Sequence, residues 1–279
     1  MKILKYLSLV LVLALAVSCE KHEILYDATP VADMAEFQLH YMVPVTAVAA
    51  NNITKVEING KLYANSKAPL NTYNAIPSGA VGRFYTVDPG NVNIKMYQGT
   101  DMATLVYDQN VALTSGKQNI VIHDFNTVPV VFNNGFPYVA NVTAETDSTC
   151  WIKFYNFLYE TAGVPTDLKL QYQYIDPRDA TNLINIGEPV SFGETTGWQP
   201  VKVVKSIEIS SGYARIDYRI KVIDGNGAVV GDLQVMKTNG TYASYADYWT
   251  GYIGRRYHHI MSGMRAAAPV SAVRVFTAL

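Results

Sequence analysis

The stretch Arg215-Ile216-Asp217-Tyr218-Arg219-Ile220-Lys221-Val222 has the clearest periodicity in the chain. Apolar side chains at 216, 218, 220 and 222 alternate with charged side chains at 215, 217, 219 and 221. Because successive side chains of a β-strand point to opposite faces, this alternation predicts a strand with one face in a core and the other in water. The turn sequence Asp224-Gly225-Asn226-Gly227 and the apolar stretch 229–235 follow, which predicts an antiparallel return.

Similar patterns fill the rest of the C-terminal half. Strands are predicted at 151–157, 168–174, 252–261 and 272–278, with a longer insertion at about 176–204. Cys150 precedes the first of these strands, and its position predicts a buried, unreactive thiol. Residues 150–279 are therefore predicted to form a β-sandwich.

The N-terminal half shows the same kind of pattern. Asn59-Gly60 lies between the apolar stretches 53–58 and 61–63, and both residues tolerate the positive φ angles of a type I′ hairpin. Further strands are predicted at 37–43 (half-buried), 81–87, 92–98, 105–107, 111–113 and 119–123, the second and third of them paired as a hairpin. Residues 35–132 predict a first sandwich and 133–149 a linker, so the fold class predicted is all-β, with two tandem antiparallel β-sandwiches.

The N-terminus has the features of an export signal. Lys2 and Lys5 precede the apolar stretch 7–17, which is short for a membrane span, so residues 1–18 predict a secretory signal peptide. Leu15-Ala16-Val17-Ser18-Cys19 resembles the lipobox of bacterial lipoproteins. That resemblance implies cleavage before Cys19 and its acylation by fatty acids such as palmitate, which would anchor the protein in a membrane. An ordinary signal peptide cut near Ser18 is the alternative.

Residues 19–34 are polar and aperiodic, which predicts a flexible leash after the anchor. Glu20-Lys21-His22-Glu23 resembles the charged tract that some Bacteroidetes lipoproteins carry for display on the outer face. These resemblances imply an outer-membrane lipoprotein that is exposed at the cell surface.

Composition restricts the classes of function. Of the 279 residues, 49% are hydrophobic and 16% are charged, which favours a folded β protein over a disordered chain. The formal net charge of −1 and the lack of a basic run give no electrostatic footprint for nucleic acid.

Both halves open with an aromatic strand, Phe37-Gln38-Leu39-His40-Tyr41 and Ile152-Lys153-Phe154-Tyr155-Asn156. Both also end near a glycine followed by a basic residue, at Ser115-Gly116-Lys117 and Gly254-Arg255-Arg256. Together with Asn59-Gly60-Lys61-Leu62-Tyr63, these segments resemble the family numbered 4397 among the domains of unknown function. The resemblance implies immunoglobulin-like or transthyretin-like sandwiches on secreted or lipid-anchored bacterial proteins, and it carries no catalytic residues.

Motifs for catalysis or metal binding are not evident. The five histidines include the pair His258-His259, whose side chains should point to opposite faces of a strand and so cannot ligate one metal together. The sequence has no Gly-x-Ser-x-Gly elbow and no His-Glu-x-x-His motif, and no pair of carboxylates stands out for glycoside hydrolysis. We therefore expect no cofactor, no metal and no enzymatic activity.

The aromatic stretch 242–252 is the candidate recognition site. Its candidate contact residues for a glycan or a protein partner are Tyr242, Tyr245, Asp247, Tyr248, Trp249 and Tyr252. The alternative is that the large rings, Tyr248 and Trp249 above all, fill the end of a sandwich core.

The predicted function is non-enzymatic binding, adhesion or a structural role at the bacterial surface. A glycan-binding accessory lipoprotein of a polysaccharide-uptake system and a fimbrial subunit or anchor are the alternatives. The former would need exposed, flat aromatic platforms, and the latter a sheet edge or groove that accepts a donor strand.

Overall fold

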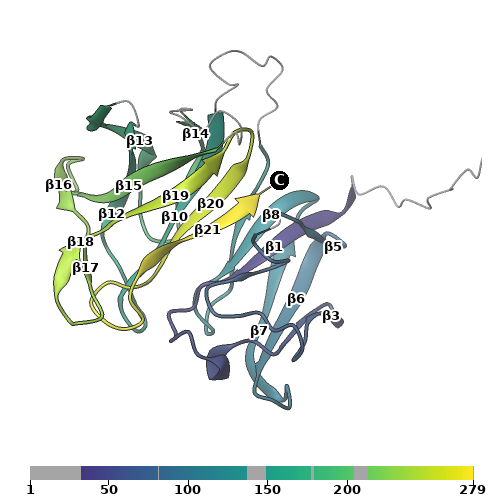
Figure 1. Ribbon diagram of the computed structural model, residues 1–279. Coiled ribbons are helices and arrows are strands. Elements are labelled where there is room, and N and C mark those ends of the chain that lie inside the picture. The colour runs from purple at the N-terminus through teal and green to yellow at the C-terminus, as the bar shows by residue number, and fades with distance from the viewer. Residues whose placement is uncertain (1–32, 81, 137–148, 177–178, 204–212, 279) are drawn as a thin grey trace, which may run out of the picture. The chain divides into compact units, whose positions relative to one another are not determined.

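The computed structural model describes residues 33–80, 82–136, 149–176, 179–203 and 213–278. These residues form twenty-one β-strands and one short 3₁₀ helix, η2 (Ala49–Asn51), and no α-helix occurs among them (Figure 1). The all-β class is therefore confirmed. The predicted signal peptide and Cys19 lie outside the described residues, as does most of the predicted linker. Within the described ranges there is no helix of the length and apolarity that a membrane span requires.

The N-terminal half contains two sheets around one core. The outer N-terminal sheet has the order β3-β2-β6-β7, and the inner N-terminal sheet has the order β4-β1-β8-β9, with β5 also paired to β1. The strands are β1 (Ala35–Tyr41), β2 (Lys55–Ile58), β3 (Lys61–Ala64), β4 (Ala75–Ile76), β5 (Tyr85–Val87), β6 (Gly90–Gln98), β7 (Thr104–Leu113), β8 (Gly116–Ile122) and β9 (Val130–Asn133). Apolar side chains of both sheets, such as Phe37 and Ile94, form the core between them.

The C-terminal half repeats this arrangement. The inner C-terminal sheet has the order β11-β10-β20-β21, with β14 also paired to β10. The outer C-terminal sheet has the order β13-β12-β15-β16, with β19 also paired to β15, and β17 and β18 form a separate hairpin. The strands are β10 (Thr149–Thr161), β11 (Val164–Pro165), β12 (Lys169–Asp176), β13 (Asp179–Val190), β14 (Thr195–Lys202), β15 (Tyr213–Ile223), β16 (Val229–Asp232), β17 (Gln234–Met236), β18 (Tyr242–Ser244), β19 (Ala246–Tyr252), β20 (Arg256–Met264) and β21 (Ala272–Ala278).

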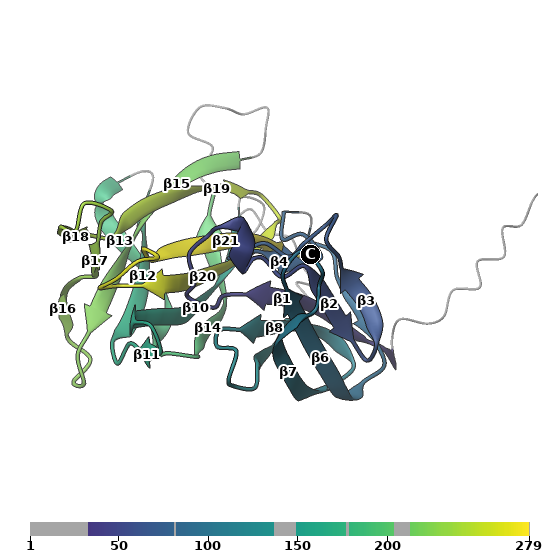
Figure 2. The same ribbon diagram turned by 90° about the horizontal axis from the view of Figure 1, so that it is seen from below.

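A third cluster of buried side chains joins the two inner sheets. It combines residues of the N-terminal half, such as Val121, with Tyr155, Phe157 and Phe276 of the C-terminal half. Figure 2 shows the inner strands β1 and β8 beside β10 and β20. Each inner sheet is therefore buried on both faces, against its own outer sheet and against the other inner sheet. Residues Ala32–Leu279 accordingly form one compact unit.

This packing changes the interpretation of β1. Its alternation predicts a half-buried strand, but Gln38 and His40, on the face that should meet water, are fully buried. They are buried because that face contacts the C-terminal half, where Gln38 Nε2 donates to the carbonyl of Thr277 at 3.3 Å. The outer strand β15 behaves as predicted, with Ile216, Tyr218 and Ile220 buried.

Each inner sheet also contains a parallel pair where the sequence predicts antiparallel sandwiches. Strand β1 runs parallel to β8, with Ala35 opposite Gly116, and β10 runs parallel to β20, with Trp151 opposite Arg256. A parallel pair needs a long crossover, which is available because the two strands of each pair stand at opposite ends of their half. These are the same segments whose similarity between the halves is visible in the sequence.

Some local predictions hold and others fail. Asn59 (φ 49°) and Gly60 (φ 77°) both have positive φ, as the predicted β2–β3 hairpin requires. The predicted hairpin of 81–87 with 92–98 is wrong, because β5 pairs with β1 while β6 pairs with β2 and β7. The predicted insertion at 176–204 contains two strands, β13 and β14.

Polar side chains occupy the middle of the contact between the halves. Tyr155 Oη lies 2.8 Å from His258 Nδ1, and Asn119 Nδ2 donates to Tyr155 Oη at 3.1 Å and lies 2.9 Å from His258 Nε2. His40 packs edge-on against Phe276 with 4.8 Å between ring centroids. His259, on the opposite face of β20, contacts Trp249 inside the C-terminal core, so the two adjacent histidines do point to opposite faces.

Burial lowers the pKa of all three histidines. The pKa of His40 falls to about 4 and that of His259 to about 3, in both cases mainly by desolvation, and burial also lowers the pKa of His258 well below its ordinary value. The unfolded chain therefore binds protons that the folded chain does not as pH falls below about 6.5. The folded protein should thus lose stability progressively between about pH 6.5 and pH 4.

We predict that the free energy of unfolding, measured by urea titration, falls between pH 7 and pH 4, with His40 alone contributing about 3 kcal/mol. The variant His40→Phe removes this ionisation but keeps an aromatic ring beside Phe276. The free energy of unfolding of this variant should fall less steeply with falling pH than that of the wild type. Carboxylates contribute equally to both proteins, so the difference between the two slopes reports on His40. Identical pH slopes for the two proteins would contradict the assignment.

Candidate functional site

The aromatic stretch 242–252 divides between the core and the surface. Trp249 is 5% exposed and makes edge-on contacts with Tyr257 and His259, at centroid distances of 4.8 and 4.6 Å. Tyr245 is also 5% exposed, and its Oη accepts a hydrogen bond of 2.8 Å from the backbone N–H of Val273. Both side chains belong to the core of the C-terminal half, so neither offers a surface to a ligand.

Tyr248 lies on the exposed side of β19 and is 54% exposed. The guanidinium of Arg215 lies 3.7 Å from the centroid of its ring, which is the geometry of a cation–π contact. Arg215 is held there by Asp217, whose Oδ1 accepts hydrogen bonds from Nε and Nη2 at 3.1 and 2.7 Å. This hydrogen bonding is the main cause that raises the pKa of Arg215, so the cation stays charged.

Strand register explains why these side chains meet. In the antiparallel pair of β15 and β19, Asp217 lies opposite Tyr248 and Arg215 lies opposite Thr250. Arg215 is therefore a diagonal neighbour of Tyr248 on the same face of the sheet, within reach of a long side chain.

A second aromatic pair extends this surface. Tyr213 and Tyr252 lie opposite each other, with ring centroids 5.3 Å apart and planes inclined by 45°, and the guanidinium of Arg255 lies 4.3 Å from the ring centroid of Tyr252. Tyr248 and Tyr252 are about 13 Å apart along one strand. We call this surface the Tyr–Arg face, and its residues are Tyr213, Arg215, Asp217, Tyr248, Tyr252 and Arg255.

The other predicted contact residues lie elsewhere. Asp247 is exposed, but its Oδ1 accepts a hydrogen bond of 2.8 Å from the backbone N–H of the next residue, Tyr248. Tyr242 is 50% exposed in the β17–β18 hairpin, and no hydrogen bond or ring contact among the described residues joins it to the Tyr–Arg face.

Four members of the face were not predicted, namely Tyr213, Arg215, Asp217 and Arg255. The alternation of 215–222 indicates that Arg215 and Asp217 are exposed, but nothing in the sequence shows that β15 pairs with β19. Arg255 lies in the turn after β19, and its guanidinium lies over the ring of Tyr252. The missing information is the register between distant strands.

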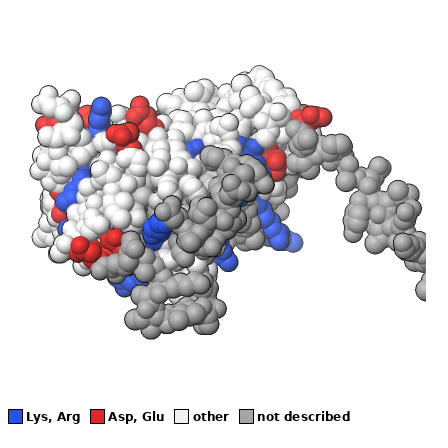
Figure 3. Space-filling view, turned by 90° about the horizontal axis from the view of Figure 1, so that it is seen from above, with Lys and Arg blue, Asp and Glu red and all other residues white. Residues whose placement is uncertain are grey.

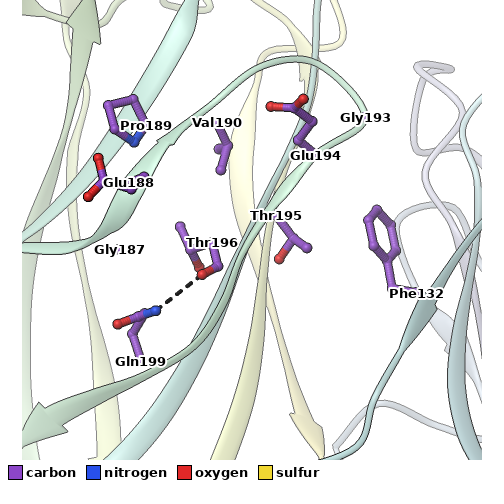
Figure 4. A pocket seen from close by; sticks show the side chains of 10 residues that line it. All are labelled: Phe132, Gly187, Glu188, Pro189, Val190, Gly193, Glu194, Thr195, Thr196 and Gln199. Carbon is purple, nitrogen blue, oxygen red and sulfur yellow. Dashed lines mark hydrogen bonds between the residues drawn. The ribbon is translucent and has the colours of Figure 1, made fainter. Parts of the chain in front are cut away.

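A cavity of about 650 Å³ lies between the β13–β14 connection and Phe132 (Figure 4). Several of its polar side chains are already hydrogen-bonded to backbone groups. Glu194 Oε2 accepts the N–H of Ser191, Thr195 Oγ1 donates to the carbonyl of Phe154, and Gln199 Nε2 donates to the carbonyl of Thr196. The cavity therefore presents few groups that converge on a ligand.

A smaller cavity, about 240 Å³, includes His123, Asp124 and Tyr159. His123 Nδ1 lies 2.8 Å from Tyr159 Oη, and burial lowers the pKa of His123. Within the described ranges no group of three or more His, Cys, Asp or Glu side chains is arranged to hold a metal ion. Cys150 is fully buried, which confirms the predicted burial of its thiol, and burial raises the pKa of this thiol to about 12. On the face seen in Figure 3, side chains of both charges are scattered and, among the coloured residues, no extended basic patch is visible.

Comparisons with known proteins add little. No protein-family model and no curated protein matches the chain. Among solved structures, the chain is similar to one from Bacteroides ovatus described as a "putative adhesin", with 11% sequence identity, 86% of this chain and 95% of that chain covered, and a TM-score of 0.21. A TM-score of this size does not establish a common fold. The resemblance to family 4397 stays a prediction.

The division of the aromatic stretch predicts different costs for two substitutions. Trp249→Ala should lower the free energy of unfolding by about 3–5 kcal/mol, because it leaves a cavity in the core. Tyr248→Ala should cost less than about 1 kcal/mol, since it removes an exposed ring and one cation–π contact. Chemical unfolding of both variants at pH 7 measures the two values, and equal losses would contradict this division.

Proposed function

We propose that the protein is a non-enzymatic binding protein of the bacterial surface, anchored through a lipidated Cys19, and that it contacts a protein partner through the Tyr–Arg face. The lipobox-like sequence 15–19 supports the anchor. The observation that carries the binding role is the stack of Arg215 on the exposed ring of Tyr248, fixed by Asp217. Both side chains are held before any partner arrives, so little conformational entropy is lost on binding.

Composition of the face favours a protein as the partner. Tyrosine and arginine are the residue types enriched at the centres of protein interfaces, and lysine and glutamate are depleted there. The Tyr–Arg face contains three tyrosines and two arginines around one aspartate. Because all of these residues except Arg255 lie on the paired strands β15 and β19, their spacing is set by the sheet.

A glycan is the second candidate partner, because Tyr248 and Tyr252 could each stack on a sugar ring. Two features count against it. One side of the Tyr248 ring is covered by Arg215, and the rings of Tyr213 and Tyr252 are inclined by 45°, so the face is not a flat aromatic platform.

The anchor is tested by labelling. We predict that the wild-type protein incorporates labelled palmitate and fractionates with membranes, and that Cys19→Ser abolishes both properties because the acylated thiol is lost. Cys150→Ala is the matched control, since Cys150 is buried, and it should keep the label. A labelled Cys19→Ser protein, or an unlabelled wild type, would contradict the anchor.

The binding face is tested by adhesion to immobilised proteins. Cells that display the wild type should adhere to members of an array of extracellular-matrix proteins. Tyr248→Ala and Arg215→Gln should each weaken that adhesion about tenfold or more, as expected for central interface residues.

Tyr97→Ala is the matched control for this experiment. Tyr97, on the outer N-terminal sheet, also carries a cation on its ring, with Lys55 Nζ 4.5 Å from the centroid. Adhesion that survives Tyr248→Ala but fails in Tyr97→Ala would contradict the assignment. Tyr248-dependent binding to a glycan array instead of proteins would favour the second candidate.

A further inference from the structure

The edge of the inner C-terminal sheet forms a groove with the N-terminal half. The groove has a volume of about 350 Å³ and lies between β21 and the segment 73–80. Its lining residues include Tyr73, Asn74, Ser78, Arg274 and Val275. It is separate from the Tyr–Arg face, which belongs to the outer C-terminal sheet.

Two donors in this groove have no partner. Arg274 lies over the ring of Tyr73, 4.5 Å from its centroid, and makes no ion pair with any carboxylate of the described residues. Its Nε is buried without a hydrogen bond, and so is the hydroxyl of Tyr73, a residue that is 8% exposed. Buried donors that lack an acceptor are costly. Other buried side-chain atoms of the described residues also lack a partner, but a group such as Trp249 Nε1 lies in a closed core, whereas Tyr73 and Arg274 line the groove.

The backbone at Tyr73 is held in an unfavourable conformation that keeps its ring in the groove. Tyr73 has a φ angle of 56°, in the left-handed region that residues other than glycine seldom adopt. Its N–H donates to the carbonyl of Tyr41 at 3.0 Å, which fixes the turn. Strain of this kind is concentrated at ligand-binding positions.

The edge of β21 offers one open backbone position. Val273 N–H donates to Tyr245 Oη, and Thr277 N–H donates to the carbonyl of Gly79 at 2.6 Å, so the backbone groups of these residues point away from β20. By the alternation of an antiparallel ladder, the N–H and C=O of Val275 point the same way. No hydrogen-bond partner for them is found among the described residues, and Val275 is 42% exposed.

We propose that this groove binds an extended peptide segment that carries a Glu or Asp side chain. The carboxylate would accept hydrogen bonds from Arg274 and from the hydroxyl of Tyr73, and the peptide backbone would pair with Val275. A carboxylate matches a cation beside two unpartnered donors, because it is an anionic acceptor. The open N–H and C=O of Val275 match a peptide residue, which offers both an acceptor and a donor, whereas a free carboxylate ion offers no donor.

The neighbouring contact at Thr277 shows that an N–H group of this edge can donate to a backbone carbonyl from another segment. The acceptor there is the carbonyl of Gly79, which lies in a turn. The bound peptide would lie between this contact and the hydroxyl of Tyr245, which limits strand addition to the region around Val275.

Fluorescence polarisation with the detergent-solubilised full-length lipoprotein tests the proposal. The probe is a dye-labelled peptide, acetyl-Thr-Val-Glu-Val-Thr-amide, and its analogue has Gln in place of Glu. We expect the Glu peptide to bind at least tenfold more tightly than the Gln peptide, since the charge-assisted hydrogen bonds are lost in the analogue.

Three variants test the individual contacts. Arg274→Gln should weaken binding of the Glu peptide about tenfold or more, and Tyr73→Phe about threefold or more, by loss of one hydrogen bond. Val275→Pro should also weaken it about threefold or more, because proline removes the N–H that faces the groove and is tolerated on a sheet edge. Arg219→Gln, which removes an exposed arginine from β15, is the matched control and should bind like the wild type.

Several results would overturn the proposal. They are no binding at millimolar peptide, equal binding of the Glu and Gln peptides, unchanged binding by folded Arg274→Gln, or sodium acetate competing as well as unlabelled peptide does. A thermal melt of each variant establishes that it is folded. Because Tyr248 belongs to the outer C-terminal sheet and does not line this groove, Tyr248→Ala should bind the probe normally, so failure here leaves the adhesion proposal standing.

Discussion

The buried contact between the two inner sheets is the constraint on which the rest of the structure depends. Strands β1, β8, β10 and β20 are buried on both faces, so they cannot bind a partner and their polar groups can pair only within the protein. Asn119, Tyr155 and His258 hydrogen-bond to one another in the middle of the contact, whereas Gln38 Oε1 and both ring nitrogens of His40 have no hydrogen-bond partner among the described residues. At its rim Gly79 permits close approach, since a β-carbon there would lie 2.1 Å from the ring of Phe276. The two halves thus share a core, and relative motion of the halves would break the hydrogen bonds among Asn119, Tyr155 and His258 and expose apolar side chains of this contact.

Local features of the fold could be predicted from the sequence because they depend on neighbouring residues. The Asn59-Gly60 hairpin and the alternation of 215–222 are determined within ten residues, and both are present. The similar segments of the two halves turned out to be the parallel pairs β1–β8 and β10–β20. The burial of Gln38 and His40 was not predictable in the same way, because it comes from a sheet more than 100 residues away. The same limit explains β5, which pairs with the distant β1 in the inner sheet and not with its neighbour in the chain, β6, in the outer sheet.

The candidate site was predicted only in part for a related reason. A stretch rich in tyrosine and tryptophan is typical both of a core and of a binding surface. In a strand, successive side chains of such a stretch point alternately into the core and to the surface. Trp249 and Tyr248 are adjacent, so one must point inward when the other points outward. The surface that results depends on Arg215 and Asp217 from another strand. Their charge alternation was visible in the sequence, but their pairing with β19 was not.

The layer order also determines where recognition can occur. With both inner sheets covered, only the outer faces and the sheet edges remain available to partners. The Tyr–Arg face uses an outer face, where side chains are fixed by the sheet and backbone groups are already paired. The groove beside β21 uses an edge, where one backbone position is open and side chains converge from both halves. A ligand in the groove would therefore contact both halves at once, through Tyr73 and Arg274, and would be sensitive to their packing. A ligand on the Tyr–Arg face would contact the C-terminal half alone, so the two surfaces can act independently.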